Sequence, residues 1–151
     1  MKWLMKFLVL GSIAITAQAQ VDQPKEITTS QTFGDYTVFY NVFHSTDIPA
    51  KVAETYKLVR GRDRALLNIS VVKTENGQTS LGLPAKVSGD TKNLMQQKQA
   101  LKFIEINEGD ATYYLAPFVF NNEELLHFSA QVTPTDGQPL NITFNRTLYT
   151  E

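Results

Sequence analysis

The sequence predicts an all-β protein, an antiparallel β-sandwich of immunoglobulin-like type with about eight strands. Three observations support this fold class: apolar and polar residues alternate in most apolar runs, turn signals separate these runs at short intervals, and no stretch has a convincing helical pattern. Such alternation leaves one face of each sheet in water, so two sheets must cover each other's apolar faces. A small barrel is the main competing architecture.

The first nineteen residues have the pattern of a secretory signal peptide. Lys2 and Lys6 form a basic start, a short apolar run follows, and Ala17 and Ala19 provide the small residues of a cleavage site. The apolar run is about 10 residues long, whereas a helix needs about 20 to cross a bilayer. We therefore expect cleavage between Ala19 and Gln20, a periplasmic location, and no membrane anchor in the mature form.

The remaining chain is predicted to form one domain. Residues 20–32 are polar and indicate a flexible lead-in, and residues 33–151 are predicted to form the single β-sandwich. The chain has no cysteine, which excludes disulfides, thiol nucleophiles and thiolate metal sites. Its net charge of -1 provides no general attraction for nucleic acid, and we expect no nucleic-acid partner.

The predicted strands begin at residue 36. The first, 36–43, has aromatic residues on both faces, and the second and third are expected over 52–59 and 65–72. Asn76-Gly77 then predicts a tight hairpin turn, because both residues tolerate positive φ angles.

The fourth predicted strand, 81–87, contains Pro84, which cannot donate a ladder hydrogen bond and so predicts an edge strand or a bulge. Residues 90–100 are ambiguous: Asp90 would cap a helix, but the apolar stripe after it is thin, which favours a long connection with at most one helical turn. The remaining strands are expected over 101–106, 111–115, 126–132 and 140–148.

Three of these segments resemble a known family: Gly34–Phe43 (GDYTVFYNVF), Ala65–Val71 (ALLNISV) and Gly109–Leu115 (GDATYYL). Together they are similar to an uncharacterised family of exported proteobacterial proteins, domain of unknown function 4426. The resemblance extends from about residue 33 to residue 149 and implies a signal peptide followed by one β-sandwich. It implies no activity and no functional residues.

Two sets of residues are candidates for binding. Arg60, Arg62 and Arg64 lie close together in a predicted loop, and three guanidinium groups can hold a carboxylate or phosphate. The alternative is a solvated hairpin loop that simply needs polar residues. Tyr36 and Tyr40 lie on the aromatic first strand, which is either covered on both faces or presents an aromatic contact surface to a partner.

Catalytic and metal chemistry have little support in the sequence. His44 is expected in a loop and His127 on an outward strand face, with no metal-ligand spacing between them, and no G-x-S-x-G nucleophile motif occurs. Phosphate-loop and dinucleotide fingerprints are also missing. We therefore predict no catalytic residues, no metal site and no cofactor.

These observations favour a non-enzymatic, exported binding or accessory protein that contacts a protein or a small ligand. One alternative is a periplasmic hydrolase with an unfamiliar site near His44. Another is a structural or assembly module that pairs through an edge strand. The sequence does not name the ligand, the partner or the oligomeric state.

Overall fold

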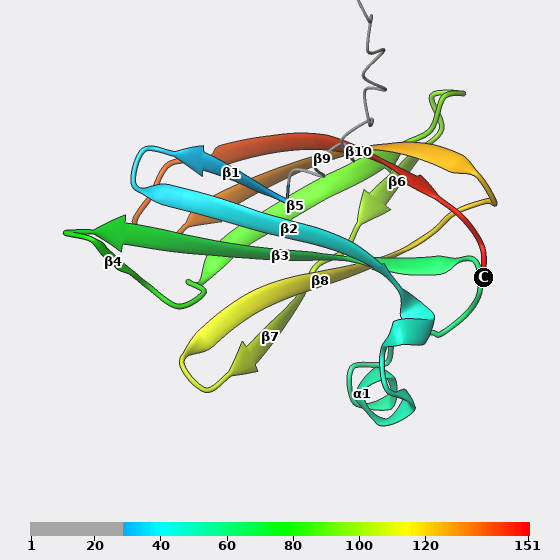
Figure 1. Cartoon of the computed structure of the whole chain (residues 1–151), viewed down its shortest axis with the longest axis horizontal. Coiled ribbons are helices and arrows are strands. Elements are labelled where there is room, and N and C mark those ends of the chain that lie inside the picture. The colour runs from blue at the N-terminus through cyan, green and yellow to red at the C-terminus, as the bar shows by residue number, and fades with distance from the viewer. Residues whose placement is uncertain (1–28) are drawn as a thin grey trace, which may run out of the picture.

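The computed structural model describes residues 29–151, which form two antiparallel sheets packed face to face (Figure 1). The predicted sandwich is confirmed, with ten strands in place of about eight. The predicted signal peptide lies outside the described residues. In chain order the elements are β1 (Ser30–Phe33), β2 (Tyr36–His44), the 3-10 turn η1 (Ser45–Asp47), α1 (Ala50–Thr55), β3 (Arg64–Glu75), β4 (Gln78–Thr79), β5 (Ala85–Lys92), β6 (Lys98–Leu101), β7 (Ile104–Glu108), β8 (Ala111–Val119), β9 (Glu124–Pro134) and β10 (Leu140–Leu148).

The larger sheet has the order β1-β2-β3-β8-β7, with β4 paired to the end of β3, and the smaller sheet has the order β10-β9-β5-β6. The chain passes from the smaller to the larger sheet between β6 and β7 and returns between β8 and β9. At the hairpin between β3 and β4, Asn76 and Gly77 have φ angles of 51° and 76°, as predicted for this turn.

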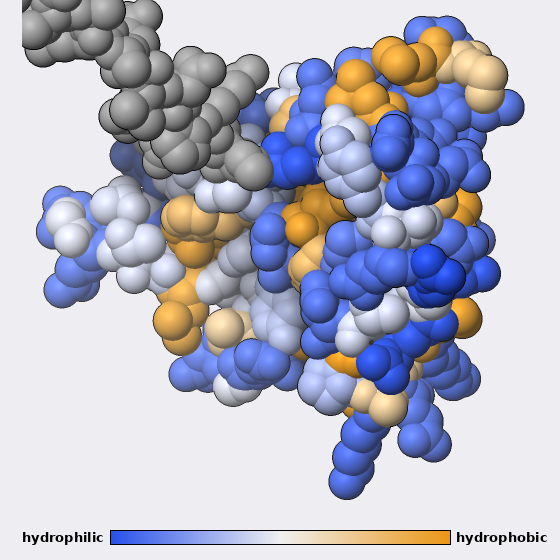
Figure 2. Space-filling view, turned by 45° about the vertical axis from the view of Figure 1, so that its right-hand side comes forward, coloured by the Kyte–Doolittle hydropathy of each residue, from blue (hydrophilic) through white to orange (hydrophobic). Residues whose placement is uncertain are grey.

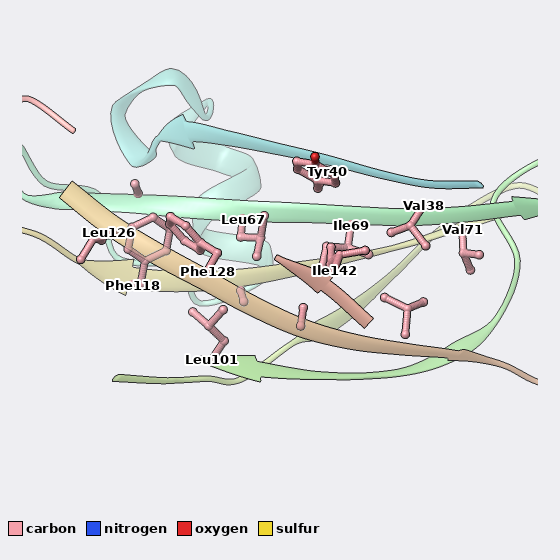
Figure 3. Close-up of a cluster of buried hydrophobic side chains, with 14 of the residues drawn as sticks. Val38, Tyr40, Leu67, Ile69, Val71, Leu101, Phe118, Leu126, Phe128 and Ile142 are labelled. Carbon is pink, nitrogen blue, oxygen red and sulfur yellow. The ribbon is translucent and has the colours of Figure 1, made fainter. Parts of the chain in front are cut away.

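The main core lies between the two sheets (Figure 3). Alternation places Val38, Ile69 and Val71 of the larger sheet against Phe128 and Ile142 of the smaller one, and each of these side chains is at most 1% exposed. The aromatic part of this core is a row of rings, in which Tyr40 stacks on Phe144 at 4.3 Å, Phe144 on Phe128 at 4.7 Å, and Phe128 meets Phe118 edge-on at 5.2 Å. These pairs add directional packing to the apolar burial.

The predicted strand over 52–59 is wrong, because this segment forms α1 and the loop after it. Pro49 precedes the helix with a φ of −56°, and Ala53 and Leu58 are the buried positions. Both pack on Leu66, on the outer face of the larger sheet, where they form a second small core. Leu58 lies three residues beyond the end of α1, and its amide bonds the carbonyl of Ala53 at 2.7 Å, so the chain folds back here and has no two-residue period of a strand. Among the described residues, no helix is long and apolar enough to cross a membrane.

Two further expectations need correction around β5. Residues 90–100 are not a long connection: β5 continues to Lys92, a five-residue turn follows, and β6 starts at Lys98. Residues 81–84 are a loop and not a strand, and Pro84 lies directly before β5. Strand β5 pairs with β9 along its whole length but with β6 only over Gly89–Lys92, so the half next to Pro84 lies at a sheet edge, as expected. The proline is tolerated because it stands outside the ladder.

The domain also begins earlier than predicted. Strand β1 starts at Ser30, inside the predicted lead-in, and the main-chain amide of Tyr40 bonds the carbonyl of Thr29 at 2.9 Å. The side chain of Gln31 reaches across to the smaller sheet and donates to the main-chain oxygen of Thr143 at 3.0 Å. Strand β1 therefore belongs to the sandwich and links the two sheets along one side.

Candidate functional site

A pocket of about 680 Å³ opens at the end of the sandwich where β2 begins and where β3 and β9 end. Its walls come from segments that are distant in sequence: the start of β2, the hairpin of β3 and β4, the loop before β5, and the turn after β9. The lining residues are Tyr36, Lys73, Glu75, Gln78, Thr79, Ser80, Leu83, Pro84, Pro134, Thr135 and Asp136.

The apolar wall of the pocket is held in place by the loop before β5. Main-chain bonds from Ser80 to Lys73 and from Leu83 to Val71, both 2.8 Å, attach this loop to the edge of β3 that β8 has left free. On its other side, the carbonyl of Gly82 accepts the amide of Thr112 in β8 at 3.0 Å. The loop thus fills the gap between β3 and β8, and it places Leu83 and Pro84 at the pocket.

Tyr36 forms the aromatic side of the pocket and is half-buried. The Nζ atom of Lys73 lies over the ring, 5.5 Å from its centroid, which is a cation–π geometry. A Cβ atom added at Gly137 would lie 3.2 Å from the hydroxyl oxygen of Tyr36, so the turn after β9 approaches the tyrosine closely. The ring is therefore held between β3 and this turn.

The charges around the pocket are mostly negative. Lys73 donates to Glu75 at 2.7 Å, and this bond is the main cause that raises the pKa of Lys73, with smaller contributions from Tyr36 and Asp35. Asp136 has no ion-pair partner within residues 29–151. One ammonium and two carboxylates thus line the pocket, which favours a cationic ligand over an anionic one.

The two tyrosines proposed from the sequence have different environments. Tyr36 lines the pocket, whereas Tyr40 is only 3% exposed and lies in the main core. Its ring stacks on Phe144, and its hydroxyl accepts a hydrogen bond from Gln31 at 3.3 Å. The expected contact surface around Tyr40 is therefore incorrect, because β2 is covered on the face to which Tyr40 points. Phe39, on the opposite face of β2, is the exposed aromatic residue at 46%.

The arginine cluster lies at the opposite end of the sandwich and contacts the chain's own last residues. Arg62 donates from Nε to the main-chain oxygen of Glu151, and Thr46 donates to the Glu151 carboxylate. Arg60 bonds the carbonyl of Thr46 at 3.0 Å. Arg64 is the first residue of β3 and not a loop residue as predicted. Arg60 and Arg62 therefore both bond main-chain oxygens of the same chain.

The histidines show no catalytic arrangement in the part of the chain that the structure describes. His44, which is the last residue of β2 and not in a loop, contacts the main-chain oxygen of Tyr149 at 2.8 Å and the Glu151 carboxylate at 3.7 Å. His127 lies on the outer face of β9 and bonds Asn145 of β10. No hydroxyl nucleophile bonds either ring, and residues 29–151 contain no cluster of three or more potential metal ligands among His, Cys, Asp and Glu.

Sequence reasoning identified Tyr36 but missed Lys73, Leu83 and Asp136, which share its pocket. Each of these belongs to a different segment, and only the strand pairing brings them together. Pro84 and Pro134 were the available signals, because each marks the place where a strand of the smaller sheet begins or ends beside the pocket.

Comparison with known proteins agrees with the fold. A crystal structure of a DUF4426 family protein from Pseudomonas aeruginosa PAO1 is 30% identical, with a TM-score of 0.70 over 81% of this chain and 94% of that chain. FetP of uropathogenic Escherichia coli strain F11 has a TM-score of 0.60 at 11% identity, over 81% of this chain and 93% of that one. A copper-bound FetP variant gives the same TM-score and identity and is covered to 95%.

At 11% identity the likeness to FetP shows a shared fold and nothing about copper. A search of curated proteins finds no match. The family model described as "Domain of unknown function (DUF4426)" matches residues 30–151, which includes every strand from β1 to β10. The chain therefore belongs to the DUF4426 family.

Proposed function

We propose that this protein is an exported, non-enzymatic binding module whose pocket at Tyr36 receives a small amphipathic cation. The observation that carries the proposal is the pocket itself, in which an apolar wall lies directly beside a negatively charged rim. Pockets that bind small molecules typically combine a mostly apolar lining with a few polar groups that fix orientation.

Two contacts define the ligand class. Leu83, Pro84 and Pro134 offer an apolar surface for an aliphatic or aromatic group. Asp136 offers a carboxylate without an ion-pair partner in the described region, and Lys73 already shows that an ammonium is accommodated over the face of the Tyr36 ring. A ligand with an amine next to an apolar group, such as an aromatic amine or the side chains of a Leu-Lys peptide, fits both features.

The test is titration of the isotope-labelled protein with a panel of aromatic amines, aliphatic amines and Leu-Lys dipeptides, followed by amide chemical shifts. We expect shifts at Lys73, Leu83 and Thr135, and at least a tenfold loss of affinity in Tyr36→Ala. Phe39→Ala is the matched control, because Phe39 is an exposed aromatic residue on the opposite face of the same strand. Shifts that are absent across the whole panel, or equal in both variants, would refute the pocket as the binding site.

Export is part of the proposal and rests on the N-terminal pattern, which lies outside the described residues. Purified material should begin at Gln20 when the gene is expressed in an export-competent bacterial host. Periplasmic protein that still begins at Met1 would contradict the proposed processing.

Edge-strand pairing is a weaker alternative at β10, because side chains already cover that edge. Gln31 donates to the carbonyl of Thr143 and Arg146 to that of Asn145, at 3.0 and 2.9 Å. Just beyond the strand, His44 contacts the carbonyl of Tyr149. A chain that adds to this edge would have to displace these contacts.

A further inference from the structure

The turn between β5 and β6 projects two apolar side chains into solvent. Leu94 is 70% exposed and Met95 74%, the two largest exposed fractions among the large apolar residues of the described chain. In Figure 1 this turn extends beyond the body of the sandwich, and Figure 2 shows apolar colour at the same end, among hydrophilic neighbours. We call residues 93–97 the apolar tip.

The apolar tip is held rigidly by one buried amide. Asn93 is 7% exposed, and its side-chain oxygen accepts the main-chain amides of Met95 and Gln97, both at 3.0 Å. Its side-chain nitrogen donates to Gln97 at 2.7 Å and to Glu124 at 3.2 Å, and its carbonyl accepts the amide of Gln96 at 3.0 Å. Because these amides are satisfied within the turn, little hydrogen bonding with water is lost when the tip is covered.

The apolar tip and the pocket lie at opposite ends of the same strand. Pro84, which lines the pocket, directly precedes β5, and Asn93 directly follows it. The tip is convex and apolar, whereas the pocket is concave with an apolar wall. The charges are complementary as well: Lys92 beside the tip and Asp136 at the pocket have no ion-pair partner within residues 29–151.

A second cation at the base of the tip, Lys98, lies 3.7 Å from Asp90, and a second anion at the pocket, Glu75, is bound to Lys73. These two pairs are satisfied within one chain. The match between Lys92 and Asp136 therefore carries the charge complementarity between the two ends.

We propose that the pocket takes the apolar tip of a second copy of this chain, so that molecules associate head to tail. The proposal rests on the pocket proposed above and names a partner for it. Leu94 and Met95 correspond to the apolar group of the ligand, and Lys92 corresponds to its cationic group. The tip and the pocket are different surfaces, so one such contact leaves a free tip on one molecule and a free pocket on the other, and association can extend to longer chains.

The contact is small. A turn of five residues buries much less than the ~1,200 Å² typical of stable complexes, so the association is weak and depends on concentration. The rigid tip partly compensates, because little conformational freedom remains to be lost on binding.

The test is sedimentation velocity of the protein, processed as in its host, from micromolar to millimolar concentration. We expect a weight-average mass that rises with concentration, and a rise in Kd of about tenfold in Leu94→Ser, the loss expected for one exposed leucine that is buried on binding. Val59→Ser is the matched control, because Val59 is 60% exposed and outside both the tip and the pocket. Lys92→Asp and Asp136→Lys should each weaken association, and the doubly substituted chain should recover it.

A mixture gives the sharpest readout. Leu94→Ser retains the pocket and Asp136→Lys retains the tip, so each variant alone should associate more weakly than the parent, while the mixture should form a one-to-one complex with about the Kd of the parent. A chain that stays monomeric at millimolar concentration overturns the proposal, and so does an association that Leu94→Ser leaves unchanged. Binding to phosphatidylglycerol vesicles that requires Leu94, without self-association, also overturns it and indicates a lipid surface instead. In each of these three cases, chemical shift changes from the amine panel would still support the pocket as a ligand site.

Discussion

Replacement of Gly82 by alanine tests how the loop before β5 supports the pocket. A Cβ atom at this position would lie 2.2 Å from the main-chain oxygen of Thr112 and 3.0 Å from the hydroxyl of Ser70. Since neither the loop nor β8 can keep its place, the bonds from Thr112 to Gly82 and from Leu83 to Val71 should both be weakened. At about 1 kcal/mol for each of the two bonds and roughly 1–3 kcal/mol for the overlap, we expect a loss of about 3–5 kcal/mol in the free energy of unfolding.

The assay is urea unfolding followed by far-ultraviolet circular dichroism, with Gly61→Ala as the matched control. A Cβ atom at Gly61 would meet only side-chain atoms of Arg64 and Asp63 at 3.3 Å, and both side chains can move. The control should therefore stay within about 0.5 kcal/mol of the parent, as surface substitutions usually do. Equal stability of the two variants would refute the reasoning, because it would mean that the loop does not depend on close approach to β8.

Three further predictions follow from the core, the hairpin of β7 and β8, and the apolar tip. Phe128→Ala should cost about 3–5 kcal/mol in denaturant unfolding, because a 1% exposed ring that contacts both Phe118 and Phe144 is lost; a cost below about 1 kcal/mol would contradict this packing. Burial and the hydrogen bond to Glu108 raise the pKa of Tyr113 to about 12. Its contribution to stability should therefore be complete below about pH 10 and lost as the pH rises through 12; absorbance at 295 nm should show a late tyrosine transition that moves to lower pH in Glu108→Gln. Asn93→Ala should speed hydrogen exchange at Met95 and Gln97 by at least tenfold and leave exchange in β9 unchanged, whereas equal exchange would show that the tip does not depend on Asn93.

The fold class was predictable because alternation is strict where one face of a strand is buried. In β9 and β10 the inward residues read directly as core, and both strands appear within one or two residues of their expected positions. The segment over 52–59 was mispredicted because its apolar residues cover the outer face of the larger sheet, and nothing in a local window shows that this face needs covering.

The strand β6 and the extension of β5 were missed for a different reason. Their residues, such as Asp90, Lys92 and Lys98, are polar on the exposed face, and the inward positions in the extension of β5 are Thr91 and Gly89 rather than large apolar residues. Gly89 is needed because a Cβ atom there would lie 2.5 Å from the carbonyl of Ser129. Pairing with β9, which the sequence does not display, is what makes this segment a strand.

The site was less predictable than the fold because it depends on where segments end and not on their periodicity. Tyr36 was visible as an aromatic residue, but its neighbours at the pocket lie between 37 and 100 positions away along the chain. The arginine cluster was visible as a charge pattern, but the oxygen that Arg62 bonds belongs to the main chain of Glu151, 89 positions away. Composition therefore identified residues with binding chemistry, and only topology decided which of them face an open pocket.

Strand β5 connects the two proposed contact regions and determines how they affect each other. It is paired with β9 over its whole length and with β6 over Gly89–Lys92, so the pocket loop and the apolar tip are attached to opposite ends of one strand of the sheet. Allostery requires two states that differ in structure or dynamics. Because the strand is rigid, we expect that a ligand bound in the pocket does not change the tip of the same molecule. An amphipathic cation and a neighbouring tip should therefore exclude each other by direct competition for Tyr36 and Asp136. A saturating concentration of the amphipathic cation should dissociate the head-to-tail chains completely. It should not change hydrogen exchange at the tip of an isolated molecule.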